Sequence, residues 1–281
     1  MLNTAINLQT GFGHLTDLPC IRLQFGEASA VISLYGAQVL SYQPIPGKDI
    51  LWLSPLAQWH NEIPIRGGVP VCWPWFGPVD ARLNPQQQSL PNHGVVRTRL
   101  WQLTGQTETE QGVSLTLAVT VNDLPFYKGE VTVEFKLTLS DTLSMTLQCS
   151  TSMLQQAALH SYFAVDNIGQ TDVASLPLAY IDKLTGETVQ THTDKAQFSM
   201  EVDRIYPLTG DELKIGGTQT AILVSQQGQD ATVVWNPWQQ KSIQTKDLPD
   251  DSYQQFICVE TAHLQLDSAF TLELTQKLQC S

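Results

Sequence analysis

The sequence predicts an all-β protein, a large antiparallel sandwich with few short helices. Apolar and polar residues alternate with period two over many short runs, and helical periodicity is almost absent. The runs are bounded by Gly, Asp, Asn and Pro, which is typical of half-buried antiparallel strands. Because so many strands must hide their edges, they either stack as two sheets or close into a barrel, and we expect the sandwich.

The individual strands follow one another along the chain, each with its apolar residues on alternate positions and therefore on one face. Two of them form a predicted hairpin that turns at Ser140 and Asp141, because both flanks alternate and Asp suits a tight turn. In order, the strand candidates are CIRLQF, SAVISLY, GVSLTLAVTV, GEVTVEFKLTLS, TLSMTLQCST, TAILVS, ATVVWN and AFTLELTQKL.

The length and composition favour one domain over residues 1–281. A chain of 281 residues with 42% hydrophobic content can bury one large core, and no linker, low-complexity tract or repeat divides it. The five cysteines are far apart and include no CxxC pair, so we expect inert thiols rather than disulfides or a zinc site. We expect a monomer.

The charge of the chain argues against polyanionic partners. Fifteen basic against 27 acidic residues leave a net charge of −12, which opposes association with nucleic acid or an anionic membrane. A small anionic ligand remains compatible, because a few converging arginines dominate the field locally. The N-terminus lacks a signal-peptide pattern and no stretch of about 18 apolar residues occurs, so we expect a soluble, cytoplasmic protein.

Two polar residues lie where a strand should be apolar. In QQFICVETAH, Glu260 shares a face with Phe256 and Cys258, and in AALHSYFAVDN, His160 shares a face with Tyr162. A buried carboxylate is either paired with a cation or acts as a base, and a strand histidine is either a core residue or a proton donor. Taken singly, each position favours the structural role over the catalytic one.

Arginines beside glycines form the second unusual feature. Arg66 precedes two glycines in IPIRGGVPVCWPWFG, and Arg97 follows His93 and Gly94 in PNHGVVRTRLWQL. Planar guanidinium groups bind phosphate or carboxylate oxygens in pairs, so the two arginines predict an anion site. A neighbouring carboxylate would also explain Arg66, and a loop that enters a strand would explain the segment of His93 and Arg97. Four tryptophans lie beside prolines and suit either the core or stacking on a sugar ring: Trp73, Trp75, Trp235 and Trp238.

Six ordered segments between Ile63 and Ala262 resemble the aldose 1-epimerase (mutarotase) superfamily, and within it the glucose-6-phosphate 1-epimerase branch. They are IRGGVPVCWPWFG, HGVVR, LHSYFAV, VDRIY, VVWNPW and FICVETA. The resemblance implies a galactose mutarotase-like β-supersandwich with His160 and Glu260 as the catalytic pair. It further implies phosphate binding by Arg66 and Arg97, and contacts with the sugar from His93 and Asp203. Asn92 departs from the glutamine that the family pattern leads us to expect before the histidine.

The resemblance implies an isomerase that interconverts the α and β anomers of hexose 6-phosphates, chiefly glucose 6-phosphate, with neither a cofactor nor a metal. Its substrate would be a small sugar phosphate. Three alternatives stay open at this point. They are an aldose 1-epimerase for free hexoses, a non-catalytic carbohydrate-binding sandwich, and a metal-dependent enzyme that uses His93, His160 and Glu260 as ligands.

Overall fold

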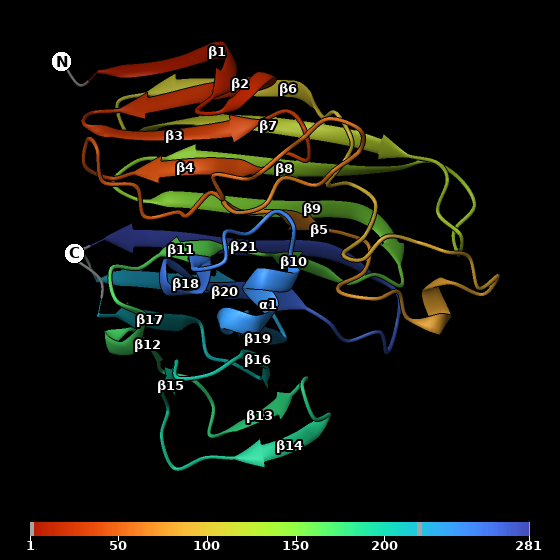
Figure 1. Ribbon diagram of the computed structural model, residues 1–281. Helices are drawn as coiled ribbons and strands as arrows, with labels where there is room; N and C mark the ends of the chain where they lie inside the picture. The colour runs from red at the N-terminus through yellow and green to blue at the C-terminus, as the bar shows by residue number, and fades with distance from the viewer. Residues whose placement is uncertain (1–2, 218–220, 281) are drawn as a thin grey trace.

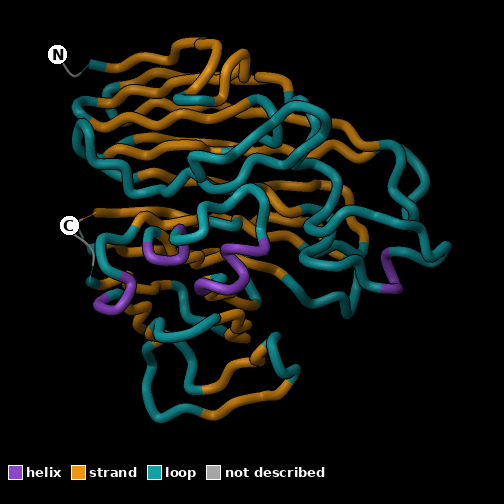
Figure 2. Tube along the Cα trace, in the orientation of Figure 1, coloured by secondary structure: helices purple, strands orange, loops and turns teal. Residues whose placement is uncertain are grey.

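A computed structural model describes residues 3–217 and 221–280 of the protein, and strands dominate it (Figure 2). The strands form three antiparallel sheets (Figure 1). The four-stranded sheet has the order β1 (Thr4–Phe12), β2 (Leu15–Phe25), β3 (Ala28–Ser33), β4 (Val39–Gln43). The nine-stranded sheet has the order β15 (Ala196–Gln197), β12 (Asp172–Ala174), β17 (Glu212–Gly216), β18 (Ile222–Gln227), β21 (Phe270–Cys280), β9 (Leu143–Met153), β8 (Val131–Leu139), β7 (Gly112–Val121), β6 (Gln102–Thr109).

The eight-stranded sheet carries the residues of interest. Its order is β14 (Glu187–Gln190), β13 (Ala179–Asp182), β16 (Val202–Pro207), β19 (Ala231–Asn236), β20 (Phe256–His263), β10 (Ala157–Leu159), β5 (Val71–Cys72), with β11 (Tyr162–Ala164) also paired to β20. The described helices are α1 (Trp238–Gln244) and the short 3₁₀ turns η1 (Ala81–Leu83), η2 (Ile168–Gln170) and η3 (Ser252–Gln254). None of these helices is long enough to cross a membrane.

The sheets pack as a sandwich whose long layer is the nine-stranded sheet. Its β6, β7 and β8 contact the four-stranded sheet, and its β21 contacts β10 and β20 of the eight-stranded sheet. One hydrophobic cluster runs between the layers and includes Leu23 from β2, Phe135 from β8, Leu274 from β21 and Val259 from β20, all of them fully buried. A core shared by all three sheets agrees with the single domain expected from the sequence, which stays a prediction.

The sequence pattern located these strands well. GVSLTLAVTV is β7 and ATVVWN is β19, residue for residue, and the predicted hairpin joins β8 to β9 with Leu139 opposite Leu143. Along β8, inward residues are buried and the alternate ones exposed, which is the burial pattern that period-two alternation requires. The candidate TAILVS starts at Thr220, which lies outside the described residues, and β18 covers its remainder from Ile222.

Candidate active site

The site lies on the face of the eight-stranded sheet that is turned away from the nine-stranded sheet. On β20, Ile257 and Val259 enter the core between the layers, while Phe256 and Cys258 belong to a separate aromatic cluster on the opposite face. Glu260 lies two positions after Cys258, so its side chain points to the same face as Phe256 and Cys258. The faces expected from the sequence for this strand are therefore confirmed.

Strand register brings His160 opposite Glu260. Leu159 in β10 pairs with Thr261, and Tyr162 in β11 pairs with Cys258, so the intervening His160 falls across from Glu260. Nε2 of His160 lies 3.5 Å from Oε1 of Glu260. The imidazole also stacks on the ring of Tyr162, with centroids 4.9 Å apart, which fixes its plane.

Both members of this pair are buried and incompletely bonded. Glu260 is 1% exposed and His160 8% exposed. Within the described part of the chain, Oε2 of Glu260 and Nδ1 of His160 have no hydrogen-bond partner. Buried polar atoms are normally satisfied, so an orphaned atom on each of two adjacent side chains indicates a position for a ligand's polar groups.

Burial also sets the protonation of the pair. Desolvation raises the pKa of Glu260 well above its usual value; the charge of Lys183 partly offsets this rise, and repulsion from Asp203 adds to it. Desolvation likewise lowers the pKa of His160, and the neighbouring His93, Arg66 and Arg97 lower it further. Burial thus favours the neutral form of each side chain, which is the protonated carboxyl for Glu260 and the uncharged imidazole for His160.

Arg66 reaches the site because the chain after it can pass close to other strands. Gly67 and Gly68 have φ angles of +104° and +62°, and a Cβ on Gly68 would lie 2.1 Å from the carbonyl oxygen of Val39. Nε of Arg66 donates to Asp247 at 3.0 Å, and Nη1 donates to the Tyr162 hydroxyl at 3.0 Å. A guanidinium has five N–H donors, so donors remain for an anion.

Arg97 is less restrained by the protein. Its Nη2 donates to the backbone oxygen of Asn92 at 2.6 Å, while its buried Nε has no partner among the described residues. Asn92 thus contributes a carbonyl that holds Arg97. The role of the shorter Asn92 side chain toward a sugar stays a prediction.

His93 stays uncharged in this environment. Its Nδ1 accepts a hydrogen bond from the backbone N–H of Gly77 at 3.3 Å. Burial, followed by the charges of Arg97, Lys183 and Arg66, lowers the pKa of His93 to about 3. A neutral ring whose Nδ1 accepts carries its proton on Nε2, so His93 can donate a hydrogen bond to a ligand oxygen.

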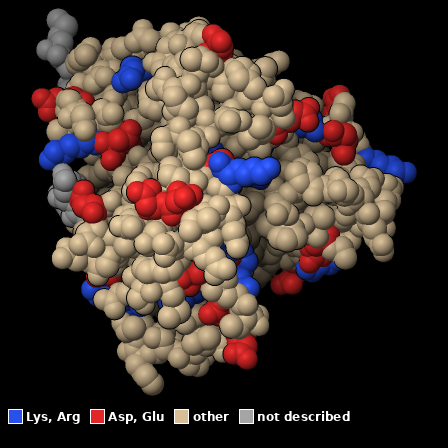
Figure 3. All heavy atoms as spheres, in the orientation of Figure 1, with Lys and Arg blue, Asp and Glu red and all other residues tan. Residues whose placement is uncertain are grey.

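A pocket of about 230 Å³ gathers most of the predicted residues. It is lined by Pro64, Ile65, Arg66, Pro70, Asn92, His93, Arg97, His160, Tyr162 and Asp247. Glu260 reaches it through His160. Figure 3 shows a mostly uncharged face of the molecule with a hollow near its middle and basic side chains at the hollow's border.

Asp203 lies further along the same sheet, outside the pocket lining. It pairs in register with Trp235 on β19, and Trp235 pairs with Cys258 on β20. The carboxylate bonds Lys183 at 3.2 Å, and Lys183 lies over the ring of Phe76. Asp203 is therefore two strands away from Glu260 and acts on it through charge.

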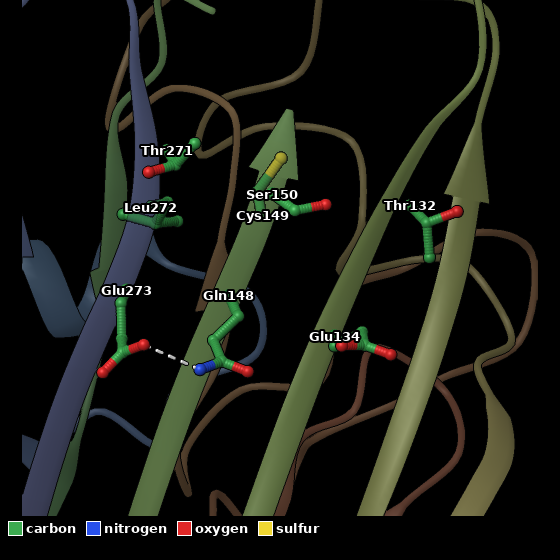
Figure 4. A pocket seen from close by; sticks show the side chains of 8 residues that line it. All are labelled: Thr132, Glu134, Gln148, Cys149, Ser150, Thr271, Leu272 and Glu273. Atoms are coloured by element: carbon green, nitrogen blue, oxygen red, sulfur yellow. Dashed lines mark hydrogen bonds between the residues drawn. The ribbon is translucent and has the colours of Figure 1, made fainter. Parts of the chain in front are cut away.

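A larger hollow of about 480 Å³ has a different character (Figure 4). It lies over β8, β9 and β21, where Glu273 accepts a hydrogen bond from Gln148 and Glu134 stands on the neighbouring strand. The described residues of its lining include two carboxylates and no Lys or Arg. An anionic ligand would be repelled there, so the smaller pocket is the better candidate.

One group of side chains in the described residues could hold a metal ion. It consists of His160, Cys258 and Glu260, whose ligand atoms lie within 4.8 Å of one another. His93, which the sequence suggested as a second histidine ligand, is not in this group. Its Nδ1 bonds Gly77 instead.

Several contacts could not be found from the sequence. Asp247 and Lys183 lie in loops and carry no pattern that points to the site, and the sequence pattern indicates only the strand face of Tyr162. Of the tryptophans, Trp73 and Trp75 are fully buried core residues, as the structural alternative expected. Trp235 lies edge-on to His160, with centroids 6.1 Å apart.

The architecture defines the protein as a galactose mutarotase-like β-sandwich. The galactose 1-epimerase structure from Lactobacillus acidophilus NCFM superposes with a TM-score of 0.76, covering 100% of this chain and 99% of that one, at 13% identity, which is a likeness of fold alone. The chain belongs to the aldose 1-epimerase family, whose profile matches residues 19–279. Members of this family are isomerases that act on sugars.

Two bacterial relatives are similar over nearly the whole chain. A protein from Escherichia coli (strain K12), provisionally named glucose-6-phosphate 1-epimerase, is 34% identical over 264 residues, 92% of this chain and 88% of its own. The crystal structure of a Salmonella typhimurium protein that is provisionally described as a mutarotase superposes on this chain with a TM-score of 0.87 at 28% identity. The match covers 98% of this chain and 97% of that one.

Proposed function

We propose that the protein interconverts the α and β anomers of hexose 6-phosphates, chiefly glucose 6-phosphate. The observation that carries the proposal is the pocket in which His160, with Glu260 3.5 Å behind it, lies beside Arg66 and Arg97. The pair supplies proton transfer and the arginines supply phosphate binding. The provisional names of the relatives point the same way.

The reaction moves one proton off the substrate and one onto it. Glu260 removes the proton from the C1 hydroxyl while protonated His160 gives a proton to the ring oxygen, and the ring opens to the aldehyde. Rotation about the C1–C2 bond then presents the other face, and the ring closes with the two roles reversed. No net proton is gained or lost.

The phosphate group would prepare the pair for this chemistry. The mechanism needs an ionised Glu260 and a protonated His160, whereas burial favours the neutral form of both side chains. Arg66 and Arg97 are among the charges that hold the pKa of His160 down. A dianionic phosphate bound to both would offset those charges and favour the imidazolium, so the phosphate contributes to turnover as well as to binding.

The arginines differ in what they offer the phosphate. Asp247 neutralises part of the charge of Arg66, and that carboxylate lines the same pocket. Among the described residues, the Arg97 side chain donates to one backbone carbonyl, and its buried Nε has no partner. Arg97 should therefore contribute more to phosphate affinity than Arg66 does.

The remaining site residues would hold the sugar. His93 donates from Nε2 to a hydroxyl, and Asp203 accepts from hydroxyls while Lys183 orients it. Asn92 also lines the pocket, so its amide would contact a further hydroxyl.

The test is NMR exchange spectroscopy of the anomeric protons of glucose 6-phosphate, with free glucose measured in parallel. The native protein should accelerate exchange of the phosphate well above its spontaneous rate and above its effect on glucose. Equal acceleration of both sugars would favour a free-hexose epimerase. Binding of the phosphate without acceleration would favour a carbohydrate-binding sandwich.

A further inference from the structure

A chain of buried polar side chains runs through the apolar core directly behind the His160–Glu260 pair. Its members are Ser161, Gln276, Thr261, Gln226 and Thr232, of which Gln226 is 4% exposed and the others are fully buried. Such groups are costly in a core unless they are bonded, and a fully bonded network makes one arrangement unique. This one touches the residues next to each member of the pair.

Beginning at Ser161, each side chain of this network donates a hydrogen bond to the next one. The Ser161 hydroxyl donates to Oε1 of Gln276, and Nε2 of Gln276 donates to the Thr261 hydroxyl at 2.9 Å. That hydroxyl donates in turn to Oε1 of Gln226 at 2.8 Å. Gln276 comes from β21 of the nine-stranded sheet, so its amide spans the space between the layers.

Gln276 also replaces a backbone hydrogen bond that is missing between two strands of the sheet, which leaves a gap in the ladder. In a regular antiparallel ladder, Ser161 and Val259 would exchange two backbone hydrogen bonds. Val259 N–H does donate to Ser161 O at 3.1 Å, but Ser161 N–H turns away and donates to Leu159 O at 3.1 Å. The carbonyl of Val259 accepts instead from Nε2 of Gln276 at 3.3 Å.

The gap lies at the catalytic pair itself. His160 N–H donates sideways to Pro70 O, so the segment between β10 and β11 is held to β20 by few backbone bonds. The Gln276 amide bonds Ser161, which follows His160, and Val259 and Thr261, which flank Glu260. One side chain therefore sets the spacing of both strands at the point where the pair faces the pocket.

We propose that Gln276 is a positioning residue that holds His160 and Glu260 at their working separation from behind the sheet. The inference rests on the proposed function for its effect on rate, but the geometry it predicts is independent of the substrate. Proton transfer depends steeply on the placement of acid and base, so a shift of about 1 Å is enough to lower the rate on the order of 100-fold.

The variant that tests it is Gln276→Met, which keeps length and apolar volume and removes the amide. We expect kcat for glucose 6-phosphate to fall roughly 10- to 100-fold while KM changes less than about twofold, because the pocket lining is untouched. The matched control is Gln155→Met. Gln155 is also fully buried and bonds Trp73 and Phe270 O, away from the pair.

A second readout does not require turnover. The ¹³Cε1 resonance of His160, assigned with His160→Asn, should shift in Gln276→Met and stay in place in Gln155→Met. If the native protein proves inactive on sugar phosphates, this resonance still decides the positioning role. Unchanged resonance and kcat in Gln276→Met, at a stability loss equal to that of Gln155→Met, would show a purely structural glutamine and overturn the proposal.

Ser161→Ala keeps the test decisive if Gln276→Met does not fold. It removes one bond to the Gln276 amide and should lower kcat in the same direction by a smaller factor, with the same resonance shifted. When both variants fold, combining them should cost less than the product of the single losses, since they act through one network. Independent losses would contradict the proposal.

Discussion

Replacing Glu260 by glutamine separates the catalytic role of this side chain from its effect on stability. Glutamine has nearly the same shape and stays neutral, which is the form that burial already favours for Glu260. The variant cannot remove a proton from the C1 hydroxyl. The loss of one general base lowers kcat on the order of 10²- to 10⁴-fold, which corresponds to about 3–5 kcal/mol of transition-state stabilisation.

Whereas kcat should fall in Glu260→Gln, the stability of the folded state should rise. Glu260 has a pKa raised above its unfolded value of 4.5, so the native state holds a proton that the unfolded state releases as pH rises beyond that value. Glu260 therefore destabilises the fold increasingly above about pH 4.5. Glu260→Gln should unfold at a higher temperature than the native protein at pH 7, and this advantage should vanish at pH 4.

The assays are anomeric exchange by NMR and thermal unfolding followed by circular dichroism at the two pH values. A variant that loses activity because it misfolds would lose stability as well, so a rate loss accompanied by a gain in stability isolates the chemistry. Retention of the native exchange rate by a folded Glu260→Gln protein would refute Glu260 as the base.

Other substitutions and treatments test the remaining assignments. Arg97→Ala should raise KM for glucose 6-phosphate roughly 10- to 100-fold, because a charge-assisted hydrogen bond to the phosphate is lost. The preference of the enzyme for glucose 6-phosphate over free glucose should become smaller. Arg99→Ala, whose arginine pairs with Asp123, is the control, and equal losses on both sugars would remove the phosphate assignment. Asp203→Asn should raise KM and shift the acid limb of the kcat/KM profile to lower pH, since Asp203 raises the pKa of Glu260. An acid limb at the same pH in Asp203→Asn and in the native protein would contradict the effect of Asp203 on the pKa of Glu260. Incubation with EDTA should leave the exchange rate unchanged, and metal analysis of the purified protein would reveal a stoichiometric ion if the metal-dependent alternative held.

Much of the fold was predictable because strand alternation is local. In β7 and β8, residues two positions apart lie on the same face, so apolar residues at alternate positions identify the face that will be buried. The burial of both strands follows this pattern. The same locality placed Glu260 and Cys258 on one face of β20. The order of strands in a sheet is not local, since β20 lies between β10 and β19, which are separated by more than seventy positions of chain.

The site shows the same division. The pattern of residues along each strand is enough to assign the faces that carry His160 and Glu260, and the motifs locate Arg66 and Arg97. The folded structure is needed to see that His160 and Glu260 face each other at 3.5 Å, that Asp247 partly neutralises Arg66, and that Gln276 bridges the strands from behind. Alternation along a strand follows from backbone geometry, whereas partners across sheets depend on register and packing that no short stretch of residues encodes.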